Sequence, residues 1–122
     1  MEDLSVLIVE SNRDLAHLWQ SHLERCGAGV LVAHTQNGAL DVLEEHRVDL
    51  IILNVVLRGG SAFSLSDKVR ALHADIPIIY VTNSTFFSDG SVFAFCPNAC
   101  AYVQTDTPPE DLAAMVEHYG RA

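Results

Sequence analysis

Basic residues are scarce in this chain of 122 residues. Seven Lys and Arg stand against 16 Asp and Glu, which gives a formal net charge of −9 at pH 7. Nucleic acids and anionic membrane surfaces are polyanions, so a domain with this charge is repelled by both. The composition therefore argues against direct binding to nucleic acid or membranes and favours protein partners.

Long apolar runs are absent as well. No apolar stretch exceeds six or seven residues, whereas a membrane-spanning helix needs about 20. The start of the chain, Met1-Glu-Asp, is acidic and lacks the basic residues of a secretory signal. We therefore expect a cytoplasmic protein.

Cysteine is limited to Cys26, Cys96 and Cys100. An odd number of cysteines in a chain with an ample core is typical of reduced thiols. Cys96 and Cys100 lack a second ligand pair at the spacing of a zinc site. We expect packing cysteines and no metal centre.

Along the chain, short apolar runs alternate with segments in which apolar residues recur at the spacing of a helix. Apolar residues make up 49% and no repeat or linker interrupts the sequence, so residues 1–122 are expected to form a single domain. Helix 13–26 has an amphipathic stripe. The predicted strands are 4–9, 30–33, 50–53, 76–82 and 101–103.

Three more helices follow from local signals. Thr35 is placed to cap one, 64–73 forms another, and Thr107-Pro-Pro-Glu110 is a capping box with proline at the first helical position. A short or irregular fourth helix is expected within 84–97. Five βα units with right-handed crossovers predict an α/β fold, a three-layer αβα sandwich around a parallel sheet.

Polar residues follow the predicted strands at their carboxyl ends, where parallel sheets gather reactive groups. These residues are Glu10 and Ser11 after the first strand, Asn54 after the third, Thr82 in the fourth, and Gln104 and Thr105 after the fifth.

Essentially the whole chain resembles the receiver domain of two-component response regulators. The resemblance rests on the order and spacing of Val-Leu-Ile-Val-Glu10, Asp49-Leu-Ile-Ile-Leu-Asn54, Pro77-Ile-Ile-Tyr-Val-Thr82 and Asn98-Ala-Cys-Ala-Tyr102-Val, with the final helix. It implies a flavodoxin-like sheet of order 2-1-3-4-5. It also implies a mechanism in which three acids bind Mg²⁺ and one of them, an aspartate, takes a phosphoryl group from a histidine kinase.

The acidic set is incomplete in this chain. Glu10 matches the first acid of the family, Ser11 replaces the second, and Asn54 replaces the phosphate-accepting aspartate. An amide is neutral and a poor nucleophile, and Mg²⁺ prefers carboxylate oxygens. Each lost charge removes roughly 4 kcal/mol of gross attraction at an effective dielectric near 20. We expect Mg²⁺ binding to be weak at best and no phosphorylation of residue 54.

The residues that contact the phosphoryl group and report on it are also only partly kept. Thr82 matches the Ser/Thr after the fourth strand, and Tyr102 matches the aromatic switch residue. Thr105 stands where the family has a lysine. Thr82 and Tyr102 have purely structural interpretations too, as a β-branched strand end and as core.

Three hypotheses follow. The leading hypothesis is an atypical receiver in a two-component phosphorelay that is not an enzyme and needs no cofactor. It would act, independently of phosphorylation, as an interaction module for signalling proteins such as a histidine kinase or an effector. The second is a phosphorylatable receiver with another acceptor, Ser11 or Ser61. The third is a small flavin- or nucleotide-binding protein, which the acids of Glu10-Ser-Asn-Arg-Asp14 oppose because they repel a bound phosphate.

Other residues leave alternatives open. Glu10 can be interpreted as a solvated carboxylate near a helix N-terminus. The six scattered histidines are expected to be solvated or locally hydrogen-bonded. Aromatic residues that remain exposed among Phe86, Phe87, Phe93 and Phe95 would mark a partner face. That face, formed by helix four, strand five and helix five, is the expected surface for a homodimer.

Overall fold

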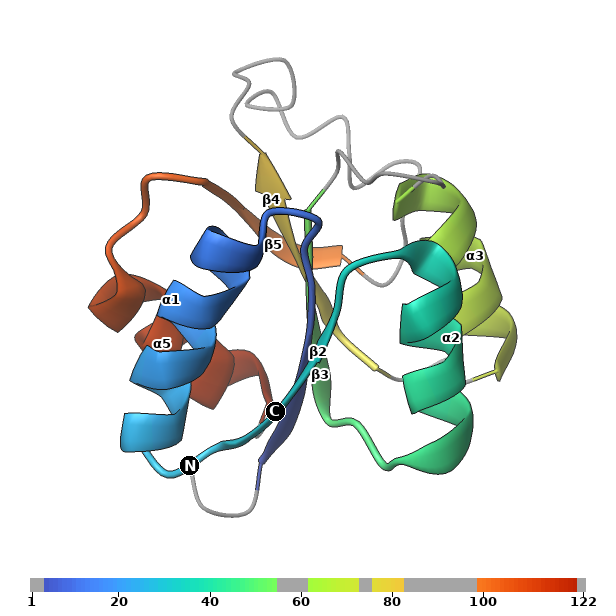
Figure 1. The fold of residues 1–122 in the computed structure, drawn as a ribbon, viewed down its shortest axis with the longest axis horizontal. Helices are drawn as coiled ribbons and strands as arrows, with labels where there is room; N and C mark the ends of the chain where they lie inside the picture. Colours follow the sequence, from blue (N-terminus) through green and yellow to red (C-terminus); the bar gives the residue numbers. More distant parts are fainter. Residues whose placement is uncertain (1–3, 55–61, 73–75, 83–98, 121–122) are drawn as a thin grey trace.

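The computed structural model describes residues 4–54, 62–72, 76–82 and 99–120. Within them, five strands form one parallel sheet of order β2-β1-β3-β4-β5 (Figure 1). The strands are β1 (Ser5–Val9), β2 (Gly29–Ala33), β3 (Leu50–Asn54), β4 (Ile78–Thr82) and β5 (Ala99–Gln104). The predicted architecture and strand order are confirmed.

Four described helices cover the two faces of the sheet. They are α1 (Arg13–Arg25), α2 (Gln36–Glu45), α3 (Ala62–Leu72) and α5 (Pro109–Gly120). Figure 1 shows α1 and α5 on one face and α2 and α3 on the other. None of the helices described is long and apolar enough to cross a membrane.

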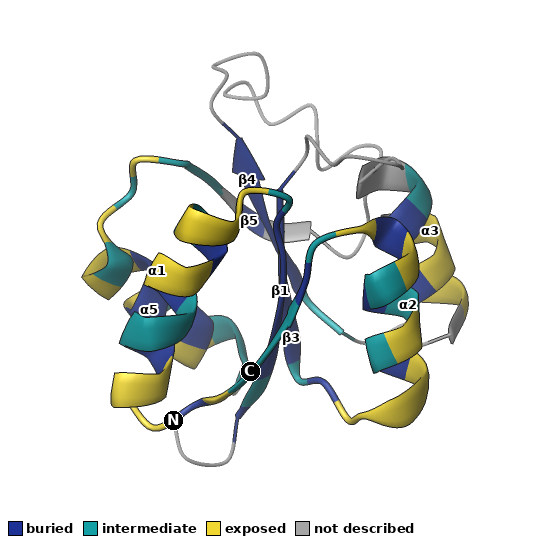
Figure 2. Ribbon diagram, viewed as in Figure 1, coloured by how far each residue is buried: buried dark blue, intermediate teal, exposed yellow. Residues whose placement is uncertain are grey.

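The side chains of successive residues of β1 pack in two different cores, one on each face of the sheet. Val6 and Ile8 pack with Trp19 of α1 and the apolar stripe of α5, whereas Leu7 and Val9 pack with α2 and α3. Side chains alternate across a strand, so a strand with helices on both faces must be apolar at consecutive positions. Figure 2 shows the central strands β1, β3 and β4 largely buried between helices that are exposed on their outer sides.

The ends of the elements differ slightly from the predicted ones. α1 begins after Asn12, whose side-chain oxygen accepts the N–H groups of Asp14 and Leu15. α2 has the predicted cap, because Gly38 N–H donates to Thr35 Oγ1 at 3.0 Å. α5 begins at Pro109, whereas the capping box at Thr107 predicts a start at Pro108. β5 is longer at both ends than predicted.

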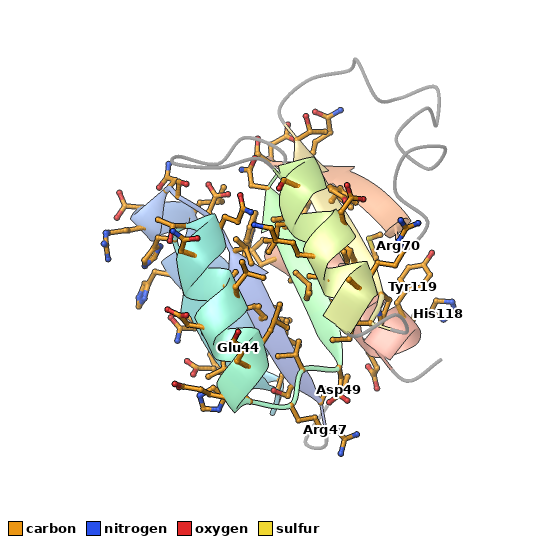
Figure 3. The ribbon with its side chains drawn as sticks, turned by 90° about the vertical axis from the view of Figure 1, so that its right-hand side faces the viewer. Glu44, Arg47, Asp49, Arg70, His118 and Tyr119 are labelled. Carbon is orange, nitrogen blue, oxygen red and sulfur yellow. The ribbon has the colours of Figure 1, made fainter. Side chains whose placement is uncertain are left out.

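The amino end of the sheet is held by Asp49, labelled with Arg47 in Figure 3. Its N–H donates to the Ser5 carbonyl at 2.8 Å, and its Oδ2 accepts the Ser5 N–H at 2.9 Å. Its Oδ1 accepts Nη2 of Arg47 at 3.1 Å. These bonds join the start of β1 to the approach to β3.

Several predictions concern residues outside the described ranges. They are the helix expected within 84–97 with its four phenylalanines, the alternative acceptor Ser61, and Cys96. The backbone of β5 is described, but the side chains of Cys100 and Tyr102 are not. The zinc, switch and homodimer interpretations that depend on these side chains stay predictions.

Candidate functional site

Strand pairing brings the predicted site residues to one edge of the sheet. Val9 pairs with Leu53, so Glu10 comes to lie beside Asn54 at the carboxyl ends of β1 and β3. On the next strand, Thr82 ends β4 and its carbonyl accepts the Thr105 N–H at 3.0 Å. Residues separated by up to 95 positions in the sequence thus meet at the carboxyl edge of the sheet, which is called the rim below.

The rim is buried to an unusual degree for polar groups. Glu10 is 3% exposed, Asn54 8% and Thr82 1%, and they are three of the four buried polar side chains in the described ranges. Burying a charge or an amide costs free energy unless hydrogen bonds replace water. The interpretation of Glu10 as a solvated carboxylate is therefore wrong, because Asn12 caps α1 and the Glu10 side chain lies inside.

The Glu10 carboxylate is only half satisfied. Its Oε1 accepts the Asn12 N–H at 3.2 Å. The Asn54 side chain is close enough to this carboxyl group to lower its pKa. The buried Oε2, however, accepts no hydrogen bond of good geometry from any described residue. Burial raises the pKa of Glu10, and Asn54, the Asn12 N–H and the nearby His34 lower it only in part.

A pair of hydrogen bonds ties the loop after β1 to the loop after β2. Ser11 Oγ donates to the His34 carbonyl at 3.0 Å. In return, Nδ1–H of His34 donates to the Glu10 carbonyl at 2.9 Å. The hydroxyl that replaces the family's second acid is thus engaged in fixing the backbone of the rim.

His34 is the site residue that the sequence interpretation missed. It is one of six histidines that are scattered along the sequence without the spacing of a metal site or a catalytic site. The signal lies in the pairing of β1 with β2, in which Val9 faces Ala33. The residues that follow, Glu10 and His34, must then be neighbours.

The far side of the rim is built by β4 and β5. Thr82 pairs with Gln104, and Thr105, where the family has its lysine, is half buried. Tyr102 pairs with Tyr80 in the register of the two strands. Thr82 and Thr105 therefore lie side by side at the carboxyl ends of β4 and β5, and the roles that the resemblance implies for Thr82, Tyr102 and Thr105 stay predictions.

Comparison with known proteins decides what this arrangement is. The family model described as Response regulator receiver domain matches residues 6–117. The chain belongs to the response regulator receiver domain family.

Two of the similar proteins are transcriptional regulatory proteins of Bacillus subtilis. The receiver is 30% identical over 117 residues to the transcriptional regulatory protein YvrH of Bacillus subtilis, covering 95% of this chain and 48% of that protein. It is 32% identical over 116 residues to YkoG of the same organism, an uncharacterized transcriptional regulatory protein, covering 95% and 50%. The chain thus spans about half the length of these relatives.

Solved structures share the fold. A CheY-like receiver domain protein from Methanospirillum hungatei superposes with a TM-score of 0.87 at 24% identity, covering 97% of this chain and 94% of that one. The response regulator protein TrrA from Thermotoga maritima, solved in complex with Mg²⁺-BeF, gives a TM-score of 0.83 at 21% identity, covering 95% and 98%. At these identities the likeness establishes the fold alone.

The donor set of this rim does not fit the Mg²⁺ of the family. Mg²⁺ requires near-octahedral oxygen ligands and is held through carboxylates. The described rim offers one carboxylate, that of Glu10, beside the neutral amide of Asn54 and the Ser11 hydroxyl bonded to His34. Across the described ranges, no three His, Cys, Asp or Glu side chains are grouped so that they could hold a metal ion.

Proposed function

We propose that this receiver works without phosphorylation of residue 54, as a protein-interaction module of a two-component signalling pathway in the cytoplasm. The observation that carries the proposal is Asn54 at the end of β3, in the place of the acceptor. An amide is neutral and its atoms are weak nucleophiles at neutral pH, so it cannot form the acyl phosphate that a carboxylate forms.

The surroundings of Asn54 support the same proposal. A phosphoryl group brings close to two negative charges, which a metal ion and a lysine must offset. Here Thr105 supplies no cation, and the Glu10 carboxylate would repel the incoming group. His34 instead ties the loop after β1 to the loop after β2, through the Ser11 hydroxyl and the Glu10 carbonyl.

In this proposal the conformation is set by protein partners. The net charge of −9 favours partners with basic surfaces, and signalling proteins such as a histidine kinase or an effector domain are the expected class. Self-association through the face that includes β5 and α5 is part of the proposal. Because the curated relatives are about twice as long, an attached output domain would add its own activity.

Phosphorylation can be tested directly by intact-mass spectrometry after incubation with acetyl phosphate and Mg²⁺. The expected result is no adduct on the wild type. A variant with Ser11→Asp, Asn54→Asp and Thr105→Lys serves as the positive control, since it restores both missing acids and the cation. A stoichiometric, acid-labile adduct on the wild type would reject the proposal and favour another acceptor.

A second experiment addresses metal binding alone. Amide NMR shifts are followed while Mg²⁺ is added, with and without beryllofluoride. We expect the amides of Glu10, Ser11 and Asn54 to move only slightly at millimolar Mg²⁺. Saturable shifts confined to these amides would show that one carboxylate suffices and would contradict the proposal.

A further inference from the structure

The strand β2 forms one edge of the sheet, and among the described strands only β1 pairs with it (Figure 1). Its three central residues are apolar and half-buried. Proteins usually protect such an edge with charged side chains, proline or a bulge. Residues 27–33 consist only of Gly, Ala, Val and Leu, and β2 pairs with β1 without a break in register. The outer edge of β2 is therefore open to pairing with another strand.

The backbone groups that face this open edge belong to two residues. At one end of β2 the Gly29 N–H donates to the Leu4 carbonyl at 2.9 Å, and at the other end the Ala33 carbonyl accepts the N–H of the residue after β1 at 3.0 Å. Alternate residues of a parallel strand bond to a given neighbour, so the first, third and fifth residues of β2 bond to β1. The N–H and C=O groups of Val30 and Val32 therefore point outward.

These outward groups are arranged symmetrically about Leu31. If a second copy of β2 pairs antiparallel with Leu31 opposite its own copy, Val30 lies opposite Val32 of the partner subunit. In an antiparallel ladder, such opposite residues can exchange two N–H···O bonds. The two Val30–Val32 pairs then form four bonds, which satisfy every outward backbone group of the two valines. The edge is thus complementary to itself.

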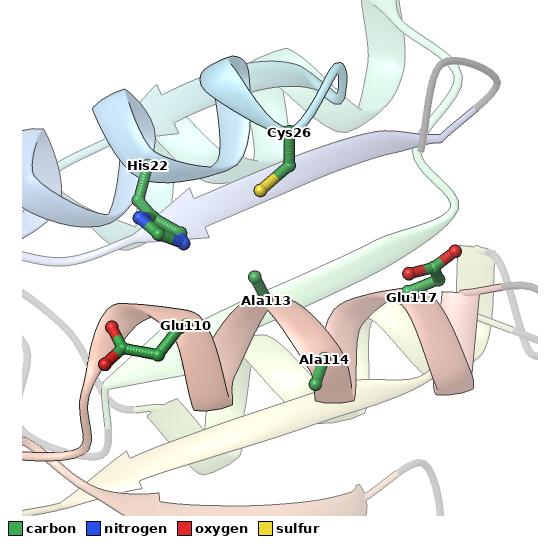
Figure 4. Close-up of a pocket in the computed structure, with 6 residues that line it drawn as sticks. All are labelled: His22, Cys26, Glu110, Ala113, Ala114 and Glu117. Atoms are coloured by element: carbon green, nitrogen blue, oxygen red, sulfur yellow. The ribbon is translucent and has the colours of Figure 1, made fainter.

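The helix α1 contacts β2, β1 and α5. His22 and Cys26 point from α1 toward α5, where they line a cavity with residues of that helix (Figure 4). Residues two positions apart on a helix point about 200° apart. Gln20 and Glu24 therefore lie on the opposite flank of α1, which is turned away from α5 and toward the β2 edge.

This flank of α1 carries a base at one end and an acid at the other. Arg13, His17, Gln20 and Glu24 recur at the spacing of one helical stripe. The two-fold axis that pairs the strands also sets α1 antiparallel to its copy, so Arg13 of each copy faces Glu24 of the other. Strands lie about 4.8 Å apart, so helices over β1 and β2 of each copy come about 10 Å apart, which is close to the packing distance of helices.

We propose that the receiver forms a weak symmetric dimer through β2, in which the two sheets join into one and α1 packs on its copy. The occupant of the edge is a second copy of this chain, because the backbone groups and the charges of the flank are both self-complementary. The net charge of −9 on each copy opposes association and keeps the dimer weak. β2 lies at the opposite edge of the sheet from β5, so this interface is distinct from the β5 and α5 face and does not depend on it.

Amide hydrogen exchange of the wild-type chain tests the strand pairing without any substitution. Exchange is recorded by NMR at micromolar and at millimolar protein concentration. The amides of Val30 and Val32 are expected to exchange about tenfold more slowly in the concentrated sample, where they are bonded in the dimer. The amides of Gly29 and Leu31 bond to β1 in both states and serve as the internal control. Exchange at Val30 and Val32 that is independent of concentration would overturn the proposal.

Cross-linking tests the register. In the proposed dimer Leu31 and its copy form a pair without hydrogen bonds, with Cα atoms about 4.5 Å apart, which is within the range of a disulfide. Leu31→Cys should therefore form a 31–31 bridge under mild oxidation, located by mass mapping of non-reduced peptides. Val30→Cys is the matched control, because its copy lies diagonally across at about 7–8 Å and is out of reach. Equal yields of the two bridges would contradict the register.

A charge exchange tests the contact between the two copies of α1, with self-association measured by sedimentation equilibrium. Arg13→Glu and Glu24→Arg should each weaken the dimer about fivefold, and the double variant should restore it. Glu24→Arg changes the net charge by two, from −9 to −7, so general repulsion alone would predict a stronger dimer. Asp67→Arg, the same charge change at an exposed position of α3, should not weaken the dimer.

Two further results would reject the β2 dimer. One is a failure of the double variant to recover the affinity that the single variants lose. The other is a dimer that protects the amides of β5 and α5 and leaves those of Val30 and Val32 exchanging freely. That second result would support self-association through the β5 and α5 face, so the two interfaces are tested separately.

Discussion

The carboxylates of Asp49 and Glu10 lie at opposite ends of one sheet, before β3 and after β1. Asp49 is 15% exposed, and each of its oxygens has a donor, one from Ser5 N–H and one from Arg47. Glu10 is 3% exposed, and only Oε1 has a donor of good geometry in the described chain. The Asp49 carboxylate therefore stabilises the fold, whereas burial of the Glu10 carboxylate costs free energy.

The difference separates structural from functional acids. A carboxylate with complete hydrogen bonds stabilises the fold, whereas a buried one with an incomplete set costs free energy. Such costs persist mainly where function has placed them. Asp49 joins the start of β1 to the start of β3, whereas the buried Glu10 lies beside the neutral side chains of Ser11 and Asn54.

Asn54→Asp should give the largest effect, because it places a second carboxylate beside the buried Glu10. Two neighbouring carboxylates cannot both ionise without cost, so we expect a loss of about 2–3 kcal/mol in the free energy of unfolding at neutral pH. Urea denaturation measures it. The loss should shrink in acid, where the pair binds protons.

Asn37→Asp is the matched control, since residue 37 is exposed on α2. It should change stability by less than about 0.5 kcal/mol. Asn54→Asp should also remain unphosphorylated by acetyl phosphate, since Ser11 and Thr105 are unchanged. Full Mg²⁺-dependent modification of this single variant would show that the acceptor alone was missing.

Removing one charge at each end of the sheet should give opposite signs. Asp49→Asn weakens the bonds from Ser5 and Arg47 and should destabilise the fold by about 1 kcal/mol. Glu10→Gln keeps an acceptor for Asn12 N–H and removes a buried charge, so it should stabilise by about 1 kcal/mol at neutral pH. If urea denaturation showed that both variants stabilise the fold, or that both destabilise it, the contrast between the two acids would be wrong.

The pH dependence sharpens this contrast. The folded-state pKa of Glu10 lies above its ordinary value of 4.5. Its contribution to stability is therefore fully present below the unfolded pKa and is lost as the pH rises through the folded pKa. Wild type and Glu10→Gln should be closest in stability below pH 4.5, and the variant should gain its advantage as the pH rises toward neutrality. A difference that does not vary with pH would contradict the raised pKa.

The sequence was sufficient for the fold because the patterns are strong and local. Consecutive apolar residues in 4–9 and 50–53 correctly indicated strands buried on both faces, and Thr35 correctly marked a helix start. For the site, the sequence predicted which residues follow the strands at the carboxyl edge of the sheet, but not how their side chains are buried. The burial of Glu10 was missed because the apolar run ends at Val9, and nothing in the local sequence shows that the next side chain turns inward.

The smallest expected effect comes from Ser11→Ala, which removes the 3.0 Å bond to the His34 carbonyl. If Ser11 fixes the rim in place of a metal-bound acid, amides 10–12 should exchange with solvent faster, while the free energy of unfolding falls by only about 0.5–1 kcal/mol. Ser21→Ala, whose hydroxyl bonds His17 within α1, is the control and should leave amides 10–12 unchanged. Unchanged exchange in Ser11→Ala would mean that the backbone bond from Glu10 to Ala33 holds the loop by itself.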